Sequence, residues 1–137
     1  MDHTADVQIH TWVRSLESAL AQQVVAMAGY MTDISTVQER DGCEALEVEA
    51  SGDDLHSVIF ALMDEFLFRF STEFYIWKRV EVLSIDRKSW TARAMARGEP
   101  WDLAKHPQGT EIKAITYSAM KVEENAERTD IWVIIDI

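Results

Sequence analysis

The sequence predicts a single α+β domain over residues 1–137, with two main helices packed against mostly antiparallel strands. Its 137 residues are the size of one ordinary domain, and apolar residues make up 47% of them, close to the globular average. Two segments repeat apolar side chains at helical spacing, whereas several shorter segments alternate apolar and polar residues as strands do.

The first third of the chain predicts a strand, a helix, a loop and a second strand. Residues 7–12 alternate and favour a β conformation. Ser15 is placed to cap a helix whose apolar residues recur every three or four positions, and Gly29 is its predicted end. Residues 30–42 predict a loop with room for one short strand, and residues 46–50 a strand with one solvated face.

The clearest helix is predicted over residues 55–70. Eight apolar side chains form one stripe along it: Leu55, Val58, Ile59, Leu62, Met63, Phe66, Leu67 and Phe70. Asp53 is placed to cap its first turn. The stripe is therefore expected in the core rather than around a cofactor.

Four more strands are predicted in the second half, at 80–85, at 90–97, near 110–122 and at 130–137, with an irregular segment over 98–109. The last of them is almost entirely apolar, as expected of a central strand that is covered on both faces.

Carboxylates at the chain ends are the best lead to a functional site. The final strand ends on the Asp136 side chain and the Ile137 main-chain carboxylate, and charge at the end of a buried strand must reach water, pair with a cation or shift its pKa. Asp2 and Asp6 could add oxygen ligands for a hard divalent cation, or could simply be solvated. Asp53–Asp54 is better explained as a helix cap. His3 and His10 are expected at the surface or in packing contacts.

The charge balance excludes several classes of partner. Thirteen lysines and arginines stand against 24 acidic residues, a formal net charge of −11. Such a chain is a poor general binder of nucleic acid or of anionic membranes. No apolar run reaches the roughly 20 residues of a membrane span, and the first six residues lack signal-peptide features. We therefore expect a cytoplasmic or nuclear protein that binds cations or basic protein surfaces.

Templates for catalysis are missing from the sequence. It contains no Gly-rich phosphate loop, no Gly-x-Ser-x-Gly elbow and no His-Glu-x-x-His pair. Cys43 is the one cysteine and is expected to be a small buried or edge residue in a reducing compartment. A metal-dependent hydrolase that uses the same carboxylates stays an alternative, but no general acid with a defined partner is visible.

Five segments together resemble the archease family. They are Asp2–Val7, Gly29–Asp33, Gly52–Leu55, Val133–Ile137 and, most strongly, the stretch from Lys105 to Met120 that begins Lys-His-Pro-Gln-Gly-Thr. The resemblance covers essentially the whole chain and is nearest to the animal-type archeases.

The resemblance implies an accessory role in RNA repair rather than catalysis. Archeases assist the RNA ligase that joins a 3′-phosphate or 2′,3′-cyclic phosphate end to a 5′-hydroxyl end, in tRNA splicing and in the unfolded-protein response. That ligase uses GTP and manganese and attaches GMP to its own histidine, and archease promotes this guanylylation and allows multiple turnover. A general chaperone for the ligase complex, without effect on its chemistry, is the alternative.

The resemblance also implies a site. The family's divalent metal ligands correspond to Asp6, Asp136 and the Ile137 carboxylate, and the ion would be calcium- or magnesium-like because every ligand is a hard oxygen. Five residues are expected beside that site or facing the ligase: Asp2, His3, Lys105, His106 and Lys113.

Overall fold

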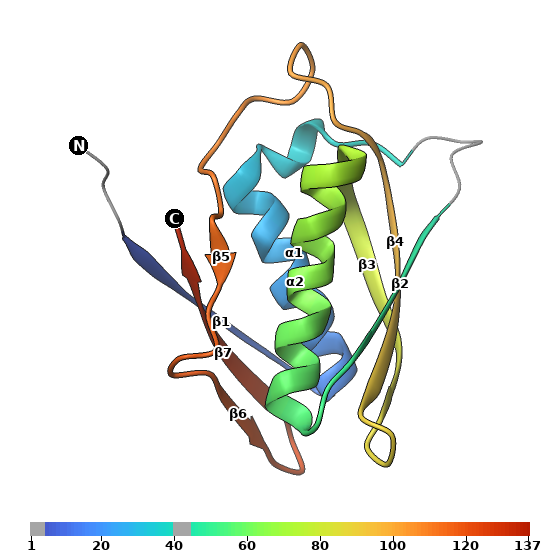
Figure 1. Ribbon diagram of the computed structural model, residues 1–137, viewed down its shortest axis with the longest axis vertical. Helices are drawn as coiled ribbons and strands as arrows, with labels where there is room; N and C mark the ends of the chain where they lie inside the picture. Colours follow the sequence, from blue (N-terminus) through green and yellow to red (C-terminus); the bar gives the residue numbers. More distant parts are fainter. Residues whose placement is uncertain (1–4, 40–44) are drawn as a thin grey trace.

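Two helices lie between two antiparallel sheets in the computed structural model, which describes residues 5–39 and 45–137 (Figure 1). The terminal sheet contains β1 (Asp6–Val13), β7 (Thr129–Asp136), β5 (Ala114–Ile115) and β6 (Lys121–Glu124). The second sheet has the order β2 (Leu46–Ser51), β4 (Thr91–Pro100), β3 (Tyr75–Asp86). The helices between them are α1 (Leu16–Met31) and α2 (Leu55–Glu73). The predicted single α+β domain is confirmed.

Helix α1 begins where the sequence predicts but ends later. The Ser15 hydroxyl accepts a hydrogen bond from the Ser18 backbone N–H, which confirms the N-cap. The predicted end at Gly29 is wrong, because the helix continues to Met31, whose side chain is buried in the core. The segment after it forms the short 3₁₀ helix η1 (Ile34–Thr36) in place of a strand.

Helix α2 is capped by Asp54, so the prediction of Asp53 is wrong by one residue. The Asp54 carboxylate accepts from the Ser57 N–H while the Ser57 hydroxyl accepts from the Asp54 N–H, a reciprocal capping box. The helix runs on to Glu73 and ends at Phe74, whose φ of 54° lies in the left-handed region.

Strand β7 is central, as predicted, with β1 on one side and both β5 and β6 on the other. The predicted strand over 110–122 is wrong for most of its length. Before β5, the N–H groups of Gly109 and Thr110 donate to the last carbonyls of α1, so this part of the segment lies against the helix end and not in the sheet. Only the short pieces β5 and β6 pair with β7.

The core lies between the two sheets, around the helices. Ile131, Val133 and Ile135 of β7 are buried, whereas the alternate residues Trp132 and Ile134 are only half-buried on the opposite face. The expectation that β7 is covered on both faces is therefore wrong, since its outer face carries no layer in the described part of the chain (Figure 1). No described helix is long and apolar enough to cross a membrane.

Candidate functional site

Asp6 and Asp136 lie directly opposite each other at one end of the terminal sheet, which we call the carboxylate end together with the Ile137 terminus. The two residues are direct partners in the antiparallel β1–β7 register. Ala5 and Ile137, the next pair outward, exchange both backbone hydrogen bonds, so Asp6 and Asp136 form a pair of the non-hydrogen-bonded kind. In such a pair the Cβ atoms lie roughly 4.5–5.5 Å apart on one face of the sheet. The terminal carboxylate of Ile137 follows directly.

This arrangement has the chemistry of a hard cation site. Two like charges directly opposite on a sheet repel each other, and a divalent cation between them would convert that repulsion into attraction. Asp6 is exposed and Asp136 half-buried, so both are accessible to a ligand. Within residues 5–39 and 45–137, no three His, Cys, Asp or Glu side chains form a metal-binding group. Among the described residues, the terminal carboxylate is the group next in line to serve as a third protein ligand.

Strand β5 holds the carboxylate end from the other side. Ala114 pairs with Asp136, and the Lys113 N–H donates to the Asp136 carbonyl at 2.7 Å. Lys113 itself is exposed. It therefore lies next to the predicted ligands, and its role toward a partner stays a prediction.

A second cluster, the Glu99 cluster, holds the segment that the resemblance singles out most strongly. The buried Glu99 carboxylate accepts from Lys105 Nζ at 2.7 Å and from the Gln38 N–H at 2.7 Å, and lies 3.1 Å from His106 Nε2. The Asp102 N–H donates to His106 Nδ1, so the ring is neutral and donates to Glu99 through Nε2. Trp101 stacks on the same ring at 5.2 Å.

Burial acts to raise the pKa of Glu99, but the hydrogen bonds from Lys105, Gln38 and His106 outweigh it and lower this pKa from 4.5 to about 2. The carboxylate is therefore charged and fully paired at neutral pH.

Two of the predicted partner-facing residues belong to this cluster. His106 is fully buried, so the prediction that it faces a partner is wrong. Lys105 is partly exposed but is bound to Glu99 and to the Gln38 side chain. Asp2, His3 and Cys43 lie outside the described residues.

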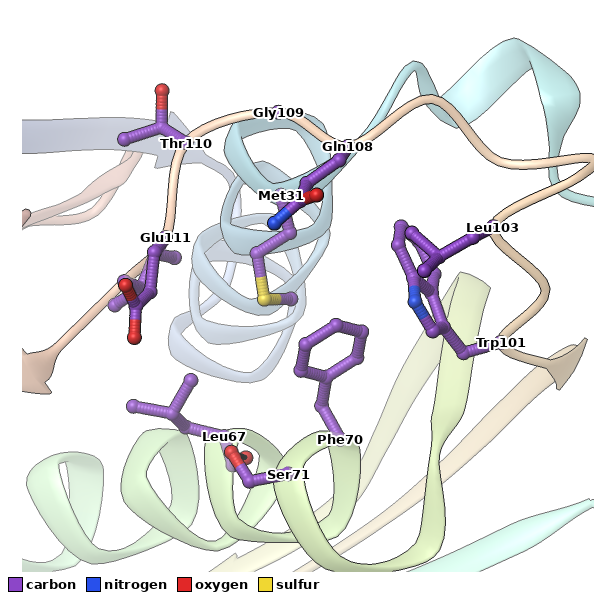
Figure 2. Close-up of a pocket in the computed structure, with 11 residues that line it drawn as sticks. Met31, Leu67, Phe70, Ser71, Trp101, Leu103, Gln108, Gly109, Thr110 and Glu111 are labelled. Atoms are coloured by element: carbon purple, nitrogen blue, oxygen red, sulfur yellow. Dashed lines mark hydrogen bonds between the residues drawn. The ribbon is translucent and has the colours of Figure 1, made fainter.

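An apolar groove with a volume of about 290 Å³ opens between α2 and the segment from Trp101 to Ile112 (Figure 2). The side chains of Met31, Leu67 and Phe70 converge on its centre, and the Trp101 ring meets Phe70 edge-on at 5.2 Å. Five of its lining residues are polar or charged or lack a side chain: Ser71, Gln108, Gly109, Thr110 and Glu111. Composition and periodicity did not reveal the groove, because its walls come from three distant segments.

The position of Gly109 explains how the groove closes at the end of α1. Its N–H donates to the Met31 carbonyl at 2.9 Å, and a Cβ there would lie 2.5 Å from the Tyr30 carbonyl oxygen. Only glycine allows the segment to approach the helix end this closely.

His10, on the outer face of the terminal sheet, makes packing and hydrogen-bond contacts with its neighbours. His10 Nε2 is bound to Asp130 at 2.8 Å, and its ring stacks on Trp132 at 4.4 Å. This confirms the expectation of a packing contact for His10.

Known proteins resemble this chain along its full length. The sequence profile of the Archease protein family matches residues 1–137. Protein archease from Danio rerio is 51% identical over 138 residues, covering 100% of this chain and 83% of that protein. An archease-like protein from Dictyostelium discoideum is 48% identical over 137 residues, covering 100% of this chain and 91% of the relative.

Two solved structures have the same fold. The solution structure of Methanobacterium thermoautotrophicum protein 1598 is 27% identical, with a TM-score of 0.74 over 100% of this chain and 96% of that one. A Thermotoga maritima crystal structure, described as an archease and possible chaperone, is 18% identical, with a TM-score of 0.64 over 100% of this chain and 94% of that one. At that identity the second likeness concerns the fold alone.

Proposed function

This chain belongs to the archease family, and we propose that it is the accessory protein of a GTP-dependent RNA ligase. The ligase joins 3′-phosphate or 2′,3′-cyclic phosphate ends to 5′-hydroxyl ends in tRNA splicing, and this protein promotes its guanylylation and its multiple turnover. GTP and manganese belong to the ligase. We place the protein in the cytoplasm and the nucleus, as an activator that performs no ligation itself.

The observation that carries the proposal is the pairing of Asp6 with Asp136 beside the Ile137 terminus. Residues from opposite ends of the chain meet there, and they present only hard oxygen donors. In our proposal these three groups hold a calcium- or magnesium-like ion. The ion would supply positive charge that orders the two strand ends for docking.

Docking in this proposal follows from charge. The net charge of −11 favours a basic surface on the ligase, and the carboxylate end would approach the ligase near its nucleotide pocket. Lys113, exposed next to Asp136, is the residue of this chain best placed to touch the partner there.

Single-turnover GMP transfer to the cognate ligase, in GTP and manganese, tests the proposal. The wild-type chain should accelerate transfer, and Asp6→Ala or Asp136→Ala should reduce that acceleration by about tenfold or more, because each removes a predicted ligand. Titration calorimetry with calcium or magnesium should show the same loss of ion binding.

Asp64→Ala is the matched control, since Asp64 is an exposed carboxylate on α2 and its loss changes the net charge equally. This variant should stimulate like the wild type. Normal stimulation by both Asp6→Ala and Asp136→Ala would rule out the metal-centred mechanism.

A general chaperone is the second candidate, and the observation that favours it is the exposure of the large apolar side chains Phe68, Phe74 and Leu103. A chaperone should protect unrelated proteins from heat aggregation, whereas an activator should change only the guanylylation rate. Light scattering of a heated client protein, with and without this chain, separates the two.

A further inference from the structure

The groove between α2 and the segment 101–112 has no role in the proposal above. Its apolar walls grade from the core to the surface: Met31 and Leu67 are buried, Phe70 and Trp101 are half-buried, and Leu103 is exposed. Leu103 stands at 65% exposure and Phe74, at the end of α2, at 61%. Exposed large apolar side chains beside an apolar groove are typical of a protein-binding site.

The Glu99 cluster makes this groove a preformed one. It fixes Trp101 against the His106 ring, while the Gly109 N–H fixes the far wall to the Met31 carbonyl. A binding site whose walls are already held loses little conformational entropy when a partner docks.

The charges decide which occupant fits. A second copy of this chain would bring together two molecules of net charge −11, which mutual repulsion opposes. Glu111 is the charged residue among the described groove-lining residues, and it is exposed. A small polar ligand would find mainly apolar walls. A partner protein that offers a basic segment and one large apolar side chain complements both the negative charge of this chain and the apolar walls of the groove.

We propose that the groove is a second docking site, which takes one large apolar side chain from a lysine- or arginine-flanked segment of the ligase. The identity of the partner rests on the proposed function. The groove and the carboxylate end use different side chains, since no residue that lines the groove is Asp6, Asp136 or Ile137.

Two neighbouring positions on α2 provide a matched test. Ser71 lines the groove and Thr72 does not, although both are exposed and both hydroxyls donate to the carbonyl four residues back. Ser71→Trp should fill the groove and weaken ligase binding, measured by titration calorimetry, by about tenfold or more. Thr72→Trp should bind like the wild type.

A second pair of variants tests whether the negative charge at the groove attracts the partner. Glu111→Lys should weaken binding by about threefold to tenfold, whereas Glu127→Lys, an equal change on the exposed turn between β6 and β7, should leave it nearly unchanged. Circular dichroism should match the wild type for all four variants. Calcium or magnesium binding should match it for Ser71→Trp, Thr72→Trp and Glu127→Lys, because these residues do not contact the carboxylate end.

The outcomes separate this inference from the proposed function. If both Ser71→Trp and Glu111→Lys bound the ligase with wild-type affinity, the groove would not be a docking site, and the proposed activator role would be unaffected. A wild-type chain that neither binds the ligase nor stimulates it would overturn the proposed function, and with it the ligase as occupant. Weak binding by Ser71→Trp and Glu111→Lys, with normal Thr72→Trp and Glu127→Lys, supports the groove.

Discussion

At the scale of single residues, the buried Glu99 carboxylate joins segments that are far apart in the sequence. It accepts hydrogen bonds from the Gln38 backbone and from the Lys105 side chain, and it faces the neutral ring of His106. A buried carboxylate is costly unless each lone pair is used, and here protein donors surround it. Glu99 therefore acts as the anchor of the segment that forms the groove.

Glu99→Gln should lower the free energy of unfolding by about 2 kcal/mol at pH 7, because the charge-assisted bonds to Lys105 and His106 are weakened. Urea denaturation measures the change. Glu81→Gln, at an exposed site on β3, is the control and should stay within about 0.5 kcal/mol of the wild type. Equal stability of the two variants would contradict the anchoring role.

The same carboxylate has a defined pH signature. Its pKa is lowered from 4.5 to about 2, so its contribution to stability is complete above pH 4.5 and is lost as the pH falls toward 2. The stability difference between wild type and Glu99→Gln should therefore shrink across that interval. A difference that stays constant down to pH 2 would show that the charge of Glu99 is not what stabilises the fold.

At the scale of elements, the start of α2 depends on two side chains that cap its first turn reciprocally. Asp54 makes the capping box with Ser57, and the Ser57 hydrogen bonds keep the pKa of Asp54 below its usual value. The carboxylate also lies near the helix N-terminus, where negative charge is favourable.

Asp54→Ala should cost about 1 kcal/mol of unfolding free energy, the usual value of an N-cap, while Asp53→Ala should cost much less. Thermal denaturation of the two variants is the measurement, and each serves as the other's control because both lose one acidic residue. A larger loss for Asp53→Ala would move the cap back to the residue that the sequence first suggests.

At the scale of the whole molecule, the net charge of −11 should govern how the protein meets its partner. The rate of association with the proposed partner, the RNA ligase, should fall by about tenfold between low and high salt, because counterions screen the long-range attraction. Stopped-flow fluorescence measures this rate, and the dissociation rate serves as an internal control that should change less. An association rate that is independent of salt would contradict electrostatic steering.

Local patterns in the sequence were sufficient for much of the fold. Helices α1 and α2, strands β1 and β2 and the central place of β7 follow from periodicity and from capping residues. Boundaries were less certain, as at the end of α1 and the cap of α2, because neighbouring residues with the same chemistry compete and packing chooses between them.

The candidate site, like the fold, was predicted in part from the sequence and in part only from the tertiary structure. The sequence by itself determined that Asp6, Asp136 and the Ile137 carboxylate are candidate ligands, and their metal stays a prediction. Only the tertiary structure decided that β1 pairs with β7 in the register that sets Asp6 opposite Asp136, and that His106 is buried against Glu99. Register and burial depend on contacts between residues far apart in the chain, and no local pattern contains them.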